Sequence, residues 1–294
     1  MKTIEIDKPA HPAQMYMGAL LSSTKRPGVI KALPKVTYVR PNVVLDAAEI
    51  AAYAKLCGFS PEHGVPLTYP QMLTFPLAME FFGSENCPWP AMGTVHLANR
   101  IVQHQRLNVG DELRVEMRTG KLIAHEKGQI FNLEMIISRD GTTVWEATQT
   151  LLRMGVSNPI GAAFASALTD ESPLSHQADF SAPADIGRRY GLVSGDLNPI
   201  HLSSASAKLF GFRAAIAHGL WTKARALAAL MPREVVTQAQ VTVEFKTPLF
   251  LPARASLWNT HQVKGPLAHS TLFEVRNAKG DKPHLRGHLS CQSN

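Results

Sequence analysis

An acid, an amide and an imidazole lie within one short stretch of the sequence, Ser-Gly-Asp-Leu-Asn-Pro-Ile-His at residues 194–201. Asp196 and His201 belong to the residue types that carry general acid–base chemistry. Asn198 before Pro199 is typical of a helix start, since Asn is a preferred N-cap and Pro suits the first helical position. His201 then falls in the first helical turn, where the helix dipole disfavours the imidazolium and predicts a neutral ring that can act as a base.

A second short motif, His218-Gly219, stands where a long apolar segment begins. Glycine lets another group approach the backbone, and an N–H at a helix N-terminus is a donor for a carbonyl that becomes an oxyanion. An acid, a base and an oxyanion donor are the parts required for chemistry beside a polarised carbonyl. The alternative is purely structural: Gly, Asp, Asn and Pro form ordinary turns, and Gly219 is then a simple helix cap.

Two helices are expected to position these residues. Apolar residues at helical spacing predict a helix from Gly219 through Met231, and Pro232 ends it. The residues at this spacing are Leu220, Ala224, Leu227 and Met231. The earlier helix, which starts at Pro199, is expected to run as far as Gly211, because glycine is favoured just beyond a helix C-terminus.

The sequence contains a loose internal repeat, which indicates two structurally related units. The stretches that align near the start of each unit are residues 46–64 and 181–201. Their alignment places Tyr53 on Tyr190 and Gly58 on Gly195.

Strands are expected to follow the helices in both units. Residues 93–117 resemble residues 240–258, and both stretches alternate apolar and polar positions as half-buried strands do. In the second stretch the apolar positions include Val241, Val243 and Phe245. Each unit then carries a predicted hairpin, with turns at Asp140-Gly141 and near Gly280.

Helices followed by runs of strands predict an α+β protein, with small alanines on the main helix leaving room for a surrounding sheet. We expect an N-terminal extension at residues 1–33 and a first unit at residues 34–154. A linker rich in small and polar residues is expected at residues 155–176, and a second unit at residues 177–294.

The amino-acid composition limits the class of protein to which the chain can belong. With 45% hydrophobic and 18% charged residues among 294, the chain is expected to be globular with a sizeable core. Polar residues interrupt every apolar stretch, so neither a transmembrane helix nor a secretory signal is expected. Cys57, Cys87 and Cys291 are scattered without a C-x-x-C pair, which suits a reducing compartment and predicts a cytoplasmic protein.

The net charge of the chain limits its possible binding partners only in part. The formal net charge is +7, but Lys and Arg are spread along the chain. A positively charged mouth for a phosphorylated small molecule explains this balance as well as nucleic-acid binding does. The twelve His residues form no H-E-x-x-H pattern, so we expect no metal.

The run from Ser194 to His201, with Tyr190 before it and His218-Gly219 after it, resembles the MaoC-like (hydratase 2) family of R-specific enoyl-CoA hydratases and dehydratases. The resemblance covers roughly residues 178–290. It implies a hot-dog fold, in which an antiparallel sheet wraps a long helix. A chain with two such units resembles the double hot-dog members of this family, in which the pair mimics a dimer of single units.

The resemblance also implies roles for individual residues. Asp196 and His201 are the expected catalytic pair, the Gly219 N–H is the expected oxyanion donor, and Asn198 is expected to orient the site. The remaining residues of the motif are expected to bind substrate: Ser194, Gly195 and His218. Two basic residues that follow the loop, Lys208 and Arg213, are candidates for an entrance that meets the phosphates of coenzyme A.

The first half departs from the motif. Phe59 falls where Asp196 would lie, Gln71 falls at the position of Gly219, and His63 stands without the paired acid. We interpret this half as a degenerate copy that kept the fold and lost the site. In such proteins this half shapes the acyl pocket, and residues 69–82 could line that pocket or simply pack a buried helix.

The expected reaction is reversible hydration of a trans-2-enoyl thioester to the (R)-3-hydroxyacyl thioester. The substrate is expected to be an acyl-CoA or an acyl-carrier-protein thioester, with coenzyme A as part of the substrate and no separate cofactor. No nucleic acid or membrane partner is expected, and a homodimer is possible. The alternatives are a hot-dog acyl-CoA thioesterase and a non-catalytic module that binds acyl thioesters.

Overall fold

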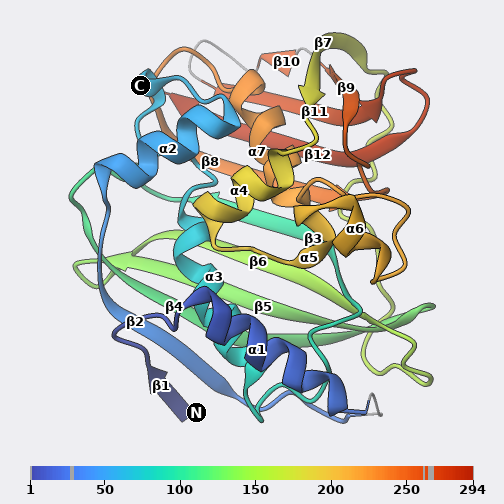
Figure 1. Ribbon diagram of the computed structural model, residues 1–294. Coiled ribbons are helices and arrows are strands. Elements are labelled where there is room, and N and C mark those ends of the chain that lie inside the picture. The colour runs from blue at the N-terminus through green and yellow to red at the C-terminus, as the bar shows by residue number, and fades with distance from the viewer. Residues whose placement is uncertain (1, 27–29, 261, 264–267, 294) are drawn as a thin grey trace. The chain divides into compact units, whose positions relative to one another are not determined.

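The computed structural model describes residues 2–26, 30–260, 262–263 and 268–293, and Figure 1 shows their helices and strands. Contacts divide the chain into two compact units. Unit 1 consists of Met1–Leu45, Pro70–Arg100 and Asp111–Ala167. Unit 2 consists of Asp46–Tyr69, Ile101–Gly110 and Leu168–Asn294. Both units combine helices with a sheet, which confirms the predicted α+β class.

The sheet of unit 1 has the strand order β1-β2-β4-β5-β6-β3. The strands are β1 (Lys2–Glu5), β2 (Val36–Val44), β3 (Thr94–Gln103, which continues into unit 2), β4 (Glu112–His125), β5 (Gly128–Arg139) and β6 (Thr142–Met154). The short β1 pairs with β2 in parallel, and the pairs β2–β4, β4–β5 and β5–β6 are antiparallel. Asp140 and Gly141 both have positive φ between β5 and β6, which confirms the predicted hairpin.

Helix α3 (Pro70–Gly83) packs on the sheet of unit 1, against β2, β4 and β5. The N-terminal residues add α1 (Pro12–Leu21) and the 3₁₀ turn η1 (Ser22–Thr24). Figure 1 shows α1 along α3, where Met15 and Ala19 pack against Met79. The expected N-terminal extension therefore contributes to the core of unit 1.

The sheet of unit 2 has the order β8-β12-β11-β9-β7, and the two-residue β10 pairs with β11. The strands are β7 (Ser175–Ala182), β8 (Val236–Phe245), β9 (Ala253–Asn259), β10 (Gln262–Val263), β11 (Ala268–Asn277) and β12 (Pro283–Ser293). The helices are α2 (Ala47–Cys57), η2 (Pro61–His63), α4 (Ile186–Ser194), α5 (Pro199–Leu202), α6 (Ser204–Lys208) and α7 (Gly219–Leu230). The turn between β11 and β12 contains Gly280 with φ 76°, so the second predicted hairpin is confirmed as well.

Helix α7 runs from Gly219 to Leu230, within one residue of the predicted end, and Pro232 follows it. It buries one face that carries both large and small side chains. The buried residues are Trp221, Thr222, Lys223, Ala224, Ala226 and Leu227. The small alanines let the helix lie close to β12.

The predicted internal repeat has a structural counterpart in α2 and α4. Each helix ends at a glycine in the left-handed region, Gly58 with φ 82° and Gly195 with φ 79°. This conformation is open to glycine at little cost and closes the last helical turn. The rings of Tyr53 and Tyr190 lie 6.2 Å apart, so the aligned tyrosines also pack against each other.

The predicted helix from Pro199 to Gly211 is wrong in one respect, because it is broken at Ser203. This residue is extended, with φ −157° and ψ 158°. Its hydroxyl accepts a hydrogen bond from the Ser206 N–H at 3.0 Å and thereby caps a second short helix, α6. The serine therefore starts a new helix instead of continuing the first one.

Residues 155–174 contain no helix or strand, and Ala163 makes an isolated bridge with Ala124. Cys57, Cys87 and Cys291 are free thiols, and all three are buried. Within the described ranges of the chain, no helix has the length and apolar character needed to cross a membrane. The expected domains divide the chain by sequence order, whereas the compact units assign residues 46–69 and 101–110 to unit 2.

Candidate active site

The loop after α4 is held by a chain of side chain to backbone hydrogen bonds. The Ser194 hydroxyl accepts from the Asp196 N–H at 3.2 Å, and Asp196 Oδ1 accepts from the Asn198 N–H at 3.2 Å. Asn198 Oδ1 in turn accepts from the Ile200 N–H at 3.3 Å, which confirms Asn198 as the cap of α5. These local bonds fix the turn before the imidazole of His201.

His201 lies in α5 with its ring buried and its tautomer defined. Its Nδ1 is 2.8 Å from the carbonyl oxygen of Ile216, which can only accept a hydrogen bond. Nδ1 therefore carries the proton, and Nε2 of the neutral ring carries a lone pair. A lone pair on Nε2 is what a general base requires.

The ring of His218 stacks on the ring of His201, with centroids 3.7 Å apart and planes inclined by 27°. His218 Nε2 donates to the backbone carbonyl of Asp196 at 2.9 Å and lies 3.7 Å from the carboxylate oxygen Oδ2. The centroid of the Tyr190 ring lies 4.9 Å from that of the His218 ring. The structure thus places His218, which is only 3% exposed, in contact with the loop that carries the acid and the base.

Both imidazoles are neutral at pH 7. Burial lowers the pKa of His201, and the Asp196 carboxylate and the bond to the Ile216 carbonyl oppose this effect. Burial, aided by the neighbouring His201, lowers the pKa of His218 to about 3. The predicted neutral ring of His201 is therefore confirmed, but the main cause is loss of solvation rather than the dipole of a helix.

Gly219 is the first residue of α7, so its N–H lies outside the hydrogen bonds of the helix. A Cβ at this position would lie 2.8 Å from the ring of Phe245. Glycine is therefore the residue that lets the start of α7 and the end of β8 come together beside His218.

The side chains of Asp196, His201 and His218 place one possible metal ligand atom each within 4.8 Å of one another. One nitrogen of each ring already contacts a backbone carbonyl. The rings are also stacked, so their in-plane lone pairs point along neighbouring planes rather than toward one common ion. This arrangement favours acid–base chemistry over metal binding, and the absence of a metal stays a prediction.

Two glycines that sequence reasoning missed bring the loop against α4. A Cβ at Gly187 would lie 1.9 Å from the carbonyl oxygen of His201, and a Cβ at Gly191 would lie 2.7 Å from that of Asp196. Both contacts are shorter than any real Cβ makes. The signal in the sequence is the four-residue spacing of the two glycines, which places them on one face of a helix.

The Gly187→Ala variant is expected to fold but to lose activity by roughly 10- to 100-fold, because the methyl group must displace His201 and catalysis is sensitive to shifts of about 1 Å. Steady-state kinetics with circular dichroism check this. Gly18→Ala is the matched control, since its Cβ would meet the Gly83 Cα at an ordinary 3.5 Å. Equal activity of Gly187→Ala and the wild type would show that the close approach does not position His201.

Arg213 and Lys208, the two basic residues expected at the substrate entrance, are both on the surface. Arg213 is exposed, and its guanidinium carbon lies 4.2 Å from the centroid of the Phe250 ring. Lys208 is the last residue of α6 and is also exposed.

The residues at equivalent positions in the first half have structural roles. Phe59 is buried, and His63 Nε2 lies 3.0 Å from the Pro232 carbonyl oxygen. Gln71 is buried in α3, where it accepts a hydrogen bond from Asn99 at 3.3 Å. Helix α3 also buries Leu73, Leu77 and Phe81 in unit 1, and its role in an acyl pocket stays a prediction.

Comparisons with known proteins define the class. A family model described as the MaoC like domain matches residues 165–278, which contain the whole candidate site. A structure from Mycobacterium tuberculosis that is described as a double hotdog fold matches with a TM-score of 0.54 at 13% identity, covering 86% of this chain and 94% of its own. The chain belongs to the MaoC-like dehydratase family and has its double hot-dog fold, so it is an enzyme of the hydro-lyase class.

One member of this family is similar to the chain along most of its length. The 3-hydroxyacyl-thioester dehydratase X of Mycobacterium tuberculosis (strain ATCC 25618 / H37Rv) is 34% identical over 260 residues, which cover 86% of this chain and 88% of the relative. The crystal structure of the mycobacterial protein HtdX matches with a TM-score of 0.71 at 32% identity, covering 86% of this chain and 98% of that chain.

Proposed function

We propose that the protein catalyses the R-specific hydration of trans-2-enoyl thioesters to (R)-3-hydroxyacyl thioesters and the reverse dehydration. The observation that carries this proposal is the neutral His201, whose Nδ1 donates to the Ile216 carbonyl and whose buried ring lies close to the half-buried Asp196 carboxylate. The similarity to a protein named 3-hydroxyacyl-thioester dehydratase supports the same reaction class.

In the proposed mechanism the Gly219 N–H donates to the thioester carbonyl oxygen and stabilises the enolate-like state. Such a donor contributes about 3–4 kcal/mol in comparable sites. Asp196 and His201 hold one water between them for hydration. His201 Nε2 takes a proton from this water as its oxygen bonds to the β-carbon, and the pair returns one proton to the α-carbon.

His218 and Asn198 support this chemistry without touching the reacting atoms. His218 holds the Asp196 carbonyl and stacks on His201, and Asn198 caps the helix that carries His201. Ser194 and Gly195 shape the turn before the acid. We expect no separate cofactor, action in the cytoplasm, and a homodimer as the form to test in solution.

Product analysis tests the proposal. Wild-type enzyme with a short or a long enoyl-CoA is expected to remove the enoyl absorbance without releasing free thiol, and chiral analysis should give the (R)-3-hydroxyacyl product. Release of thiol would instead establish a thioesterase. Binding without turnover of enoyl-CoA or enoyl-carrier-protein substrates would make the protein a non-catalytic acyl-thioester module.

A further inference from the structure

Five buried rings of unit 2 form a continuous aromatic column that ends on the imidazole of His201. The ring centroids of Tyr69 and Tyr53 are 5.6 Å apart, and those of Tyr53 and Tyr190 are 6.2 Å apart. The next centroid, that of His218, lies 4.9 Å from Tyr190 and 3.7 Å from His201. His201, at 9%, is the most exposed of the five residues, so neighbouring rings rest on each other rather than on solvent.

The aromatic column joins segments from both halves of the sequence. Tyr53 lies on α2 and Tyr69 immediately precedes α3, so both come from the half that lacks the acid and the base. Tyr190 lies on α4, His218 precedes α7, and His201 lies on α5. Contacts between α2 and α4 accompany the packing of the two aligned tyrosines. A helix from the first half is therefore linked, ring by ring, to the expected catalytic base.

Hydrogen bonds hold the tyrosine end of the aromatic column. The Tyr53 hydroxyl donates to Thr68 Oγ1 at 2.8 Å, and the Tyr69 hydroxyl donates to Glu49 Oε2 at 3.2 Å. The hydroxyls of Tyr53 and Tyr190 also share a hydrogen bond. Because Tyr53 gives its proton to Thr68, Tyr190 is the donor in this bond. The rings of the two tyrosines are thus fixed both by packing and by their bonded hydroxyls.

A second contact ties α2 to the helix that begins at the expected oxyanion donor. Gly58 ends α2, and a Cβ at this glycine would lie 2.5 Å from Nη1 of Arg225 on α7. The guanidinium therefore lies directly against the C-terminal end of α2, where the last carbonyls of a helix attract a cation. Helix α2 thus contacts both α4, which leads into the loop with Asp196, and α7, which begins at Gly219.

The two tyrosines act through their position rather than through their protons. Burial is the main cause that raises the pKa of Tyr53 and of Tyr190 well above the ordinary value, so both hydroxyls stay protonated at neutral pH. Tyr190 packs against the ring of His218, which stacks on His201 and whose Nε2 donates to the Asp196 carbonyl. A shift of the His218 ring would therefore move both the acid and the base, and catalysis is sensitive to shifts of about 1 Å.

We propose that α2, which comes from the half of the sequence without the acid and the base, is a positioning element of the active site. Tyr53 and Tyr190 are its positioning residues, and they hold His218 and through it the pair Asp196 and His201. This role is distinct from the shaping of an acyl pocket that is expected of the first half. The proposal rests on the proposed function, since its kinetic test uses the turnover of an enoyl thioester.

The first test observes His201 without any substrate. Nitrogen-15 NMR of labelled histidine side chains reports the tautomer and the pKa of each ring, and the His201→Asn variant assigns the signals. The wild type should show a neutral His201 with its proton on Nδ1. Tyr190→Leu and Tyr53→Leu should raise the pKa of His201 toward the ordinary value of 6.5, because loss of a ring lets water approach the aromatic column. The Asp196 carboxylate, which acts on the same imidazole, is unchanged in these variants.

The second test is kinetic. Tyr190→Leu and Tyr53→Leu should lower kcat for an enoyl thioester by about 10- to 100-fold with little change in KM, because the reacting groups shift while the surface that binds the substrate is kept. Tyr190→Phe and Tyr53→Phe keep both rings and lose only the bond between the hydroxyls, so kcat should fall by about 3- to 10-fold. The Phe variants keep the core filled, so they decide the test if a Leu variant fails to fold.

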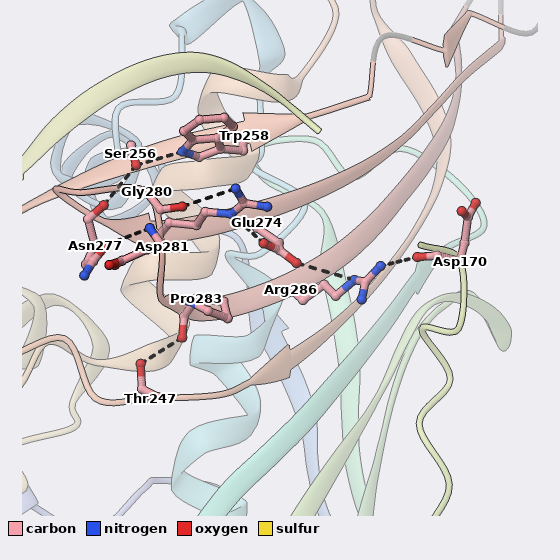
Figure 2. Close-up of polar contacts among 11 residues, drawn as sticks. Asp170, Thr247, Ser256, Trp258, Glu274, Asn277, Gly280, Asp281, Pro283 and Arg286 are labelled. Carbon is pink, nitrogen blue, oxygen red and sulfur yellow. Dashed lines mark hydrogen bonds and ion pairs between the residues drawn. The ribbon is translucent and has the colours of Figure 1, made fainter. Parts of the chain in front are cut away.

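Two control variants come from a part of unit 2 outside the aromatic column, which Figure 2 shows. Ser256 is buried in β9, where its hydroxyl donates to the Asn277 carbonyl at 3.1 Å and accepts from Trp258 Nε1 at 2.9 Å. Ser256→Ala removes a bonded hydroxyl, as the Phe variants do, and Trp258→Leu removes an aromatic ring, as the Leu variants do. Both controls should keep the kcat and the His201 signals of the wild type, even where they lower the thermal stability.

The outcomes separate the positioning role from the proposed reaction. Wild-type kcat and wild-type His201 signals in the folded tyrosine variants would overturn the positioning role while hydratase activity stands. Equal losses in the control variants would mean a general effect of lower stability and would overturn it too, as would effects of the Tyr190 variants without any effect of the Tyr53 variants. Shifted His201 signals in the tyrosine variants, with no turnover of any enoyl thioester by the wild type, would retain the positioning role and contradict the proposed reaction.

Discussion

The Asp196→Asn variant is expected to lose roughly 10²- to 10⁴-fold in kcat/KM for an enoyl thioester, which is the usual contribution of a positioned acid–base group. The substitution removes the negative charge and the proton-accepting oxygen but keeps the shape of the side chain. Its Oδ1 can still accept the bond from the Asn198 N–H that holds the loop. The fold should therefore be retained, and thermal unfolding followed by circular dichroism checks this.

Replacing His201 is expected to have an effect of the same size. His201→Ala removes the imidazole, and His201→Asn restores a donor toward the Ile216 carbonyl without restoring a basic nitrogen. Both variants should be equally slow, because the lone pair on Nε2 is what catalysis uses. His176→Ala, which removes an exposed imidazole in β7, is the control and should keep wild-type rates.

The double variant Asp196→Asn/His201→Ala tests whether the two residues act as one unit. If they hold and activate the same water, the double variant should be only slightly slower than the slower single variant. Multiplication of the two single losses would instead mean that the residues act independently. Near wild-type rates in any of the single variants would remove that residue from the mechanism.

The second large effect concerns stability. Lys223 is completely buried on α7, and burial lowers its pKa from 10.5 to about 7. The unfolded chain keeps the proton up to its ordinary pKa, so between pH 7 and 10.5 the unfolded state binds more protons than the folded state. The free energy of unfolding should therefore rise with pH in this window by about 1.4 kcal/mol per pH unit from this residue alone.

Lys223→Met is expected to raise the free energy of unfolding at pH 7, because the variant removes a buried group whose charged form is disfavoured by loss of solvation. The advantage of the variant should shrink by roughly 2–3 kcal/mol between pH 7 and pH 9. Urea unfolding of both proteins at several pH values measures the difference. Lys55→Met, at an exposed position of α2, should show no such dependence. Parallel curves for Lys223→Met and the wild type would contradict the lowered pKa.

Much of the fold and the site could be predicted because the deciding interactions are local in sequence. Asn198 and Pro199 define a helix start through their own side chains, and Asp140-Gly141 defines a turn through its own backbone preferences. The repeat of Gly58 and Gly195 was visible because a left-handed C-cap requires one residue type.

The features that could not be predicted depend on contacts between distant segments. The role of Gly187 follows from the close approach of the His201 backbone to α4. Burial of the His201 ring, which stacks on His218 from 17 positions further along the sequence, lowers its pKa and keeps the base neutral.

The two halves of the sequence, which carry the internal repeat, are not independent folding modules. Helix α2 comes from the first half of the sequence, yet it belongs to the same compact unit as α4, where Tyr53 packs against Tyr190. The Tyr53 hydroxyl in turn donates to Thr68 at 2.8 Å. A gene fragment that starts at the linker therefore encodes the loop with Asp196 and His201 but lacks Tyr53, the buried tyrosine that packs against Tyr190. Exchange of halves between related genes is constrained for the same reason.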